Sequence, residues 1–286
     1  MPRSTLAQRV VTAAVLVPLV LAALFLLPPG VWGALTLAIM ALAAHEWAKL
    51  AGYGRQRALG FNGGMLLLGL FLLSSSAMGF ARGWPPSVVL TVCGVAAAFW
   101  LIVVPPWLAR GWRPQGWLPM ALAGWVVLLG TWVAVVELQA RSPWLVLAAM
   151  AVVWIADTAA YFCGRRFGRR KLAPSISPNK SWEGVWGGLA AVAVYALLLV
   201  PFAADAGYTG PRDFAAIAAF VLFVMLLGGV SVVGDLHESL LKRHAGVKDS
   251  GSLLPGHGGV LDRIDALLAA MPLAALAATT FLPKGA

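Results

Sequence analysis

The residues between 234 and 265 combine side chains that could bind both a phosphate and a divalent cation. This stretch holds five carboxylates, four basic residues and three histidines. A turn without bulky side chains, 255–259, comes directly before Asp262 and Asp265, which lie three positions apart at the start of a predicted helix. Neighbouring carboxylates repel each other unless a cation lies between them, and oxygen ligands without cysteine suit Mg²⁺ better than zinc. The stretch therefore predicts a magnesium-dependent phosphate site.

A helix that begins at Asp235 would place Asp235, Glu238 and Lys242 on one face, at spacings of three and four residues. An amphipathic surface helix with an ordinary Glu238–Lys242 pair is the simpler interpretation, and it accounts for the charges. It does not account for a glycine-rich turn followed at once by Asp-Arg-Ile-Asp. We therefore favour a binding site.

A second polar stretch, 163–183, begins with a basic run that by itself indicates a topology anchor. Its later part is more specific, because Ser181 is a plausible N-cap for the next helix and Lys180 precedes it. A helix N-terminus beside a lysine is typical of an anion site, and phosphate is the expected anion. Ser177 and Asn179 are further short donors.

Two carboxylates lie near apolar segments. Asp157 is expected about a turn and a half inside the end of an apolar helix, where it needs a cation, a donor or a polar cavity; pairing with a nearby arginine is the alternative. Glu46 follows His45 near another helix end, and structural and functional roles are equally open. Glu137, Asp205 and Asp213 are expected to be solvated.

The elements that position these residues are transmembrane helices. The 286 residues are 60% hydrophobic and only 11% charged, which excludes an ordinary soluble globule, a disordered chain and a coiled coil. The prediction is an all-α, polytopic membrane protein, since backbone groups in lipid must be satisfied within each segment. Nine apolar segments are expected at 10–27, 31–49, 59–80, 87–104, 120–138, 144–163, 184–202, 214–233 and 266–282.

The basic residues indicate the orientation. Seventeen of the 21 lysines and arginines fall at the N-terminus and in alternate loops, including both polar stretches. This asymmetry predicts a cytoplasmic N-terminus and cytoplasmic polar stretches. The net charge of +10 therefore reports topology and contact with anionic groups rather than nucleic-acid binding. Cys93 and Cys163 are expected to be buried apolar residues.

We expect a single membrane domain, 1–286, without repeats or a linker. Residues 1–140 would form a scaffold and lipid cavity, and 141–286 the catalytic half with polar loops at 163–183 and 234–265. Small-residue spacing at Gly60/Gly64 and Gly184/Gly188 indicates close helix packing.

The C-terminal half resembles the phosphatidate cytidylyltransferase (CDP-diacylglycerol synthase) family. The family signature runs from Ser239 to Asp265, and no fixed position departs from it. Residues 157–161 and 177–184 are also similar, with Ser181 where threonine is frequent, whereas the first 140 residues match only as apolar helices. The matching positions are Ser239, Lys242, Arg243, Lys248, Asp249, Gly251, Leu254, Pro255, Gly256, His257, Gly258, Gly259, Asp262, Arg263 and Asp265.

The resemblance implies transfer of a cytidylyl group from CTP to phosphatidate, a dimeric nine-helix fold in the inner membrane and dependence on Mg²⁺. It also implies that Asp235 and Asp262 hold the metal centre, with K⁺ as an additional candidate ion. Such transfer depends mainly on positioning and charge neutralisation.

We accordingly assign roles as hypotheses. Asp157 orients a lysine or shares the metal, while Asp249 and Asp265 hold basic residues in place. Ser181, Asn179 and the turn at Gly256, His257, Gly258 and Gly259 bind substrate. Phosphates are neutralised by Lys180, Lys242, Arg243, Lys248 and Arg263.

Three other functions were weighed. A CTP-dependent lipid or polyprenol kinase could use a similar site but would release CDP. An anion transporter would place ionisable groups near the bilayer midplane. A CDP-alcohol phosphotransferase would need an Asp-Gly-x-x-Ala-Arg pattern, which the sequence lacks.

Overall fold

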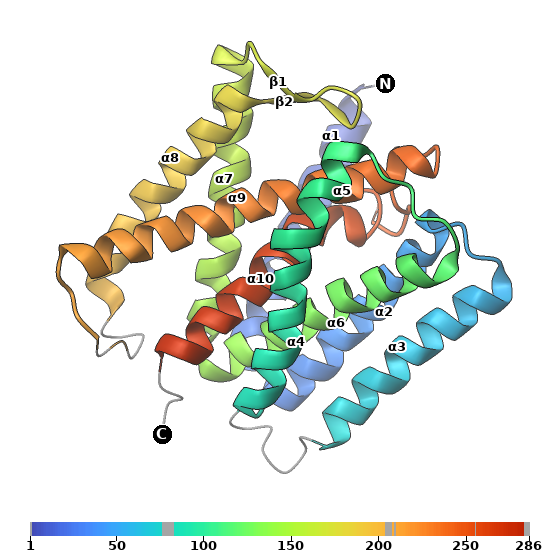
Figure 1. Ribbon diagram of the computed structural model, residues 1–286, viewed down its shortest axis with the longest axis horizontal. Coiled ribbons are helices and arrows are strands. Elements are labelled where there is room, and N and C mark those ends of the chain that lie inside the picture. Colours follow the sequence, from blue (N-terminus) through green and yellow to red (C-terminus); the bar gives the residue numbers. More distant parts are fainter. Residues whose placement is uncertain (1, 76–82, 204–207, 209, 255, 283–286) are drawn as a thin grey trace.

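The computed structural model describes residues 2–75, 83–203, 208, 210–254 and 256–282, and these residues form a bundle of helices with one small hairpin (Figure 1). The all-α prediction is confirmed. The helices are α1 Pro2–Leu26, α2 Pro29–Leu50, α3 Arg55–Ser75, α4 Pro86–Ala98, α5 Val104–Arg110, α6 Trp117–Arg141, α7 Pro143–Phe167, α8 Trp182–Leu199, α9 Phe214–His244 and α10 Leu261–Phe281. A π-helical turn, Phe99–Val103, joins α4 to α5, a 3₁₀ turn, Val200–Ala203, follows α8, and strands β1 Lys171–Ala173 and β2 Ser177–Ser181 pair antiparallel.

Eight helical segments in the described part of the chain are long and apolar enough to cross a membrane. They correspond to eight of the nine expected segments, with α4, the π-helical turn and α5 forming one continuous span, Pro86–Arg110. The first expected segment, 10–27, lies in α1, and the part of it whose side chains the structure describes includes the apolar helix Ala14–Leu26. Residues 76–80 of the third expected segment lie outside the described residues. The protein is therefore a multi-pass membrane protein.

The polar stretch 234–265 differs from the expected loop. Helix α9 does not end near residue 233 but continues to His244, so that Asp235 lies in its interior rather than at the start of a new helix. In this continuation Leu236, Leu240 and Leu241 are buried, and so are the polar His237 and Glu238. The helix persists because these leucines pack on the core even though the charged residues lower the mean hydropathy. The true loop is thus confined to residues 245–260.

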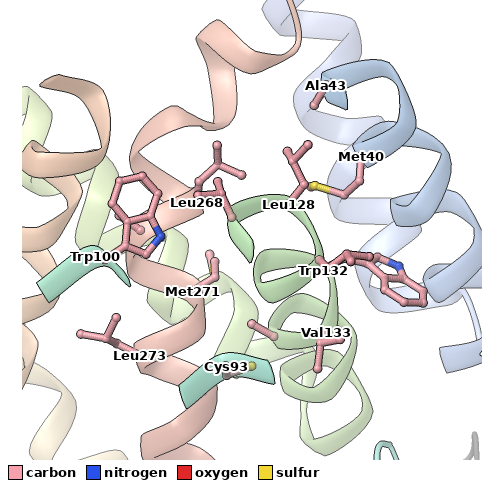
Figure 2. Close-up of a cluster of buried hydrophobic side chains, with 14 of the residues drawn as sticks. Met40, Ala43, Cys93, Trp100, Leu128, Trp132, Val133, Leu268, Met271 and Leu273 are labelled. Carbon is pink, nitrogen blue, oxygen red and sulfur yellow. The ribbon is translucent and has the colours of Figure 1, made fainter. Parts of the chain in front are cut away.

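The core is formed by α2, α4, α6 and α10, whose buried side chains interlock in the middle of the bundle (Figure 2). Trp132 and Leu128 of α6 pack between α2 and α10, and the indole of Trp132 donates to Gly33 O at 2.9 Å. Cys93 is buried here, as predicted, and the thiol contacts Gly130 O at 3.7 Å. Helices α2 and α6, which belong to the first half of the chain, thereby support α10.

Helices α7 and α8 approach each other through small residues. A Cβ on Gly184 would come within 2.8 Å of Ala160 O, and one on Gly188 within 2.8 Å of Ala156 O. The predicted packing through Gly184 and Gly188 is confirmed. Of the other predicted pair, Gly64 is closely packed, since a Cβ there would come within 2.7 Å of the Trp125 ring, whereas Gly60 has no neighbour within 4 Å of such a Cβ. The close contact fixes the β1–β2 hairpin, which joins these two helices at the top of Figure 1.

The expectation that Glu137 is solvated is wrong. Its side chain is fully buried, and Oε1 accepts a hydrogen bond from Arg141 Nε at 2.7 Å. Oε2 accepts from Trp84 N at 2.8 Å, and the guanidinium of Arg141 also donates to Leu282 O at 2.7 Å. A carboxylate on α6 can be buried because the arginine one turn later neutralises it and ties α6 to the end of α10. Asp213 instead caps α9, accepting from Ala216 N at 2.9 Å.

Candidate active site

An ion pair joins the hairpin to the last third of α9. Lys180 Nζ, on β2, lies 2.5 Å from Asp235 Oδ2, and Ser239 Oγ donates to Asp235 Oδ1 at 3.2 Å. The side chains of Lys180 and Asp235 are 23% and 28% exposed, so this pair can be reached from outside the bundle. Two residues 55 positions apart in the sequence thus meet.

Two further carboxylates surround this pair. Asp157 of α7 lies within electrostatic range of both Asp235 and Lys180, and Asp265 of α10 lies within range of Asp235. Helices α9 and α10 touch at this level, since a Cβ on Gly234 would come within 2.6 Å of Asp265 O. The region around Asp157, Asp235 and Asp265 is therefore rich in negative charge, and the ammonium group of Lys180 lies within it. Such a place attracts additional cations.

A second ion-pair group lies one turn further along α9. Lys242 Nζ is 2.8 Å from Glu238 Oε2 and 2.7 Å from Asp262 Oδ1. The side chains of Glu238 and Asp262 are only 4% and 3% exposed. The Glu238–Lys242 pair is therefore not the surface pair of the simpler interpretation, because the buried Asp262 shares its lysine.

Asp262 is also held by the loop that precedes it. Its Oδ2 accepts from Ser250 N at 2.9 Å, Ser250 Oγ at 3.0 Å and Gly259 N at 2.8 Å. Gly258 has φ +82°, and a Cβ there would come within 2.6 Å of Asp262 Oδ2. The glycine-rich turn therefore approaches Asp262 closely, and the backbone N–H groups of Ser250 and Gly259 bind its carboxylate together with the side chains of Ser250 and Lys242.

The hairpin that carries Lys180 is anchored at both ends. Ser181 is the N-cap of α8, as predicted, and its Oγ accepts from Gly184 N at 3.2 Å. Glu183 accepts from Arg169 N at 3.0 Å and from Arg170 N at 3.1 Å. Lys180 is thus presented by a short, fixed segment, and its ammonium points to Asp235 rather than to the helix N-terminus.

The remaining expected site residues lie around these two ion-pair groups. Arg243 Nε donates to Ile176 O at 3.3 Å and so connects α9 to the hairpin. His257 N donates to Leu254 O at 2.9 Å, and His257 and Gly259 lie in the same turn as Gly258. The expected site residues whose surfaces are exposed are Asn179, Arg243, Lys248, Asp249, Gly256 and Arg263.

The structure adds two residues that the prediction did not place in the site, Glu46 of α2 and Ser250. Ser250 Oγ lies 3.0 Å from Glu46 Oε2 and 3.0 Å from Asp262 Oδ2, and both Ser250 and Glu46 are 5% exposed. Ser250 lies within the signature, where a serine beside Asp249 could have been considered. Glu46 is an isolated carboxylate more than 200 residues away, and only its position near a helix end pointed to it.

The chemistry of these donors suits Mg²⁺, which prefers carboxylate oxygens. Within the described residues, no three His, Cys, Asp or Glu side chains are close enough to hold a metal ion by themselves. Mg²⁺ is commonly held by one or two carboxylates together with substrate phosphates and water. Asp235, with Lys180 at one oxygen, and Asp262, with Lys242 at Oδ1, are carboxylates at which a divalent cation could take the place of an ammonium group.

The structure is that of a multi-pass membrane protein with two lysine–carboxylate groups at the junction of α9, α10 and a hairpin. The comparisons name it more closely: residues 7–281 match the model of the cytidylyltransferase family, and the chain belongs to this family. It is 39% identical over 278 residues to a phosphatidate cytidylyltransferase of Pseudomonas aeruginosa, covering 94% of this chain and 95% of that protein. A Haemophilus influenzae protein of the same name is 36% identical, covering 93% and 96%.

Proposed function

We propose that this protein is a phosphatidate cytidylyltransferase, which converts CTP and phosphatidate to CDP-diacylglycerol and pyrophosphate in phospholipid biosynthesis. The observation that carries this proposal is the pair of lysine–carboxylate groups, Lys180–Asp235 and Lys242–Asp262, brought together from a hairpin and two membrane helices. Their positions belong to the segments that resemble the family, and the relatives named above carry this activity in their names.

The reaction is an attack of a phosphate oxygen of phosphatidate on the α-phosphorus of CTP. A new P–O bond forms, the bond from the α-phosphorus to its bridging oxygen breaks, and pyrophosphate leaves. A phosphate monoester has a second pKa of about 6, so it is largely ionised near neutral pH and needs no strong base. The demand on the protein is to bring two polyanions together.

The residues of the site meet that demand by charge and orientation. Lys180 and Lys242 are placed to neutralise phosphates once substrate competes with Asp235 and Asp262 for their ammonium groups. Arg243, Lys248 and Arg263 supply further positive charge at the rim. The backbone N–H groups of the glycine-rich turn, together with Ser181 and Asn179, would orient phosphate oxygens.

Asp235 and Asp262 would hold Mg²⁺, and Asp157 and Asp265 would lie around it. Bound Mg²⁺ supplies neutralisation of the triphosphate and polarisation of the α-phosphate. When Asp235 releases Lys180, Asp157 keeps the lysine oriented, since it already lies within electrostatic range of that ammonium. Asp265 Oδ1 accepts from Ala266 N at 2.8 Å, and its carboxylate lies within electrostatic range of Lys242, one of the basic residues that it would hold in place.

The diacyl tails require a lateral opening to the lipid. A shallow hollow of about 340 Å³ runs along one face of α7 and is lined by Trp154, Ile155 and Thr158. Thr158 is the neighbour of Asp157, so the hollow lies beside the polar cluster. We propose that this face admits phosphatidate from the inner leaflet, with the site open to the cytoplasm for CTP, in an inner-membrane homodimer.

The test is pyrophosphate release by the purified protein with phosphatidate and each nucleoside triphosphate in turn, with and without Mg²⁺. We expect release with CTP only when phosphatidate and Mg²⁺ are both present, and recovery of CDP-diacylglycerol. Replacement of K⁺ by Na⁺ in the same assay tests the additional ion. CDP among the products would indicate a lipid kinase instead, and uptake of anions into proteoliposomes without turnover would indicate a transporter.

A further inference from the structure

Glu46, near the end of α2, is a buried carboxylate that the mechanism above does not use. Its Oε1 accepts from Val260 N at 3.0 Å, and its Oε2 accepts from Leu261 N at 2.8 Å and Ser250 Oγ at 3.0 Å. The four ion pairs formed by the described residues do not include it. Three hydrogen-bond donors of the distant loop thus compensate a carboxylate that is 5% exposed.

These contacts cap α10 from another helix. Val260 is the N-cap residue of α10 and has no side-chain acceptor, so it cannot satisfy the free N–H groups at the helix start. Glu46 accepts two of them, and its negative charge lies at the positive end of the helix dipole. The start of α10, which carries Asp262, is therefore held by α2.

The glycines of the loop make this contact possible. A Cβ on Gly251 would overlap the Glu46 carboxylate, and a Cβ on Gly259 would overlap both Ser250 Oγ and that carboxylate. Both glycines belong to the signature segment. At these two positions the space is taken by Glu46.

Ser250 connects Glu46 to the catalytic carboxylate. Its hydroxyl lies 3.0 Å from an oxygen of Glu46 and 3.0 Å from Oδ2 of Asp262, so it can donate to one while remaining in contact with the other. Asp262 in turn binds Lys242 at 2.7 Å. An unbroken chain of polar contacts therefore runs from α2 to the lysine on α9.

We propose that Glu46 is a positioning residue for cytidylyl transfer. It holds residues 250–261 against α2 and thereby determines the positions of the Asp262 and Lys242 side chains. The kinetic part of this inference rests on the proposed function. The structural part, that Glu46 holds the loop 250–261, does not rest on the proposed function, because it concerns the protein without substrate.

The structural part is tested by hydrogen–deuterium exchange of the full-length protein in nanodiscs, comparing the wild type with Glu46→Gln. The amide of glutamine keeps one acceptor oxygen but turns an N–H₂ group toward the other donors, so contacts to the loop are lost. We expect faster exchange of the amides in 250–262 in the variant, with unchanged exchange in α7 and α8. Equal exchange of this loop in both proteins would overturn the proposal.

The kinetic part is tested by pyrophosphate release with CTP and phosphatidate. Loss of a group that orients a catalytic ligand typically lowers activity about 10–100-fold, and we expect a fall of this size in kcat for Glu46→Gln, with KM for phosphatidate near the wild-type value. Ser250→Ala should lower kcat less. In the double variant the two losses should not add, because both act on Asp262 through the same contacts.

Glu137→Gln is the matched control, since Glu137 is also a buried carboxylate that accepts from a backbone N–H, but it lies in the contact between α6 and the end of α10. We expect it to lower the thermal stability while kcat per folded molecule stays unchanged. Equal losses of kcat in the two variants would reduce Glu46 to a structural residue. A wild-type protein without turnover would refute the proposed function, and the exchange experiment would still decide the role of Glu46.

Discussion

Asp262 binds Lys242 through one carboxylate oxygen, at 2.7 Å, and the backbone N–H of Gly259 through the other, at 2.8 Å. One side chain thus links α9 to the loop before α10. The carboxylate is fully engaged before any substrate arrives, so substrate and cation must exchange with existing partners. Substitutions around this residue should therefore affect turnover more than folding.

Asp262→Asn is expected to lower the rate of pyrophosphate release by at least ~10²-fold, the scale for loss of one strong electrostatic contact. Asparagine fits the space but carries no charge for Lys242 or a cation. Membrane insertion should be normal, measured by the yield of folded protein in detergent.

The control for Asp262→Asn is Asp213→Asn, which makes the same chemical change at the N-cap of α9. Asparagine is as good an N-cap as aspartate, so activity and stability should both be retained. Near-normal turnover of Asp262→Asn at saturating Mg²⁺ would remove Asp262 from the catalytic centre.

Gly259→Ala should disrupt the loop, because the added Cβ would overlap Ser250 Oγ and the Glu46 carboxylate. We expect loss of most activity and faster proteolysis within 250–261. Gly229→Ala in α9 is the comparison, since a Cβ there meets nothing within 4 Å. That change should preserve activity and stabilise the helix by up to about 1 kcal/mol. A fully active Gly259→Ala variant would contradict the observed packing.

Ser181→Ala removes the N-cap of α8 and should lower the free energy of unfolding by about 1 kcal/mol. Thermal unfolding in detergent measures the loss. Ser177→Ala, on the same strand, is the comparison, and it should change the melting temperature less. If both variants melt like the wild type, the hydrogen bond from Gly184 N to Ser181 Oγ does not contribute to stability.

The ion pair between Glu137 and Arg141 should be structural. Arg141→Ala leaves a fully buried carboxylate without its cation, which typically costs about 3–5 kcal/mol. Arg212, by contrast, is exposed, and Arg212→Ala should change stability by less than about 0.5 kcal/mol. Chemical denaturation of both variants, followed by tryptophan fluorescence, separates the two expectations.

The features that sequence reasoning predicted correctly are local. Ser181 caps a helix because its acceptor and the donor of Gly184 are three residues apart, and Gly184 and Gly188 pack because they share one helix face. The apolar segments follow from hydropathy alone. Hydropathy measures how well a segment partitions into lipid, not whether it is helical. It therefore predicted the end of the apolar segment at residue 233 but not the continuation of helix α9 to His244.

The contacts that could not be predicted are those between distant segments. Nothing in the sequence relates Glu46 to Val260, 214 residues later, because the contact depends on how α2 packs beside α10. Likewise the burial of Glu137 depends on Arg141, one turn later. A glutamate and an arginine at this spacing are equally typical of an exposed helix face, so the sequence alone does not indicate burial. The resemblance identified Asp235, Asp262 and their surroundings, while their partners required coordinates.

The lysines that neutralise Asp235 and Asp262 also bear on how the protein is made. Because Lys180 and Lys242 belong to the same chain, the acidic centre acquires its counter-charges as soon as the helices assemble. Biogenesis in the bilayer would then be independent of the supply of metal and nucleotide. Under the proposed dependence on Mg²⁺, depletion of magnesium would leave a folded protein without activity.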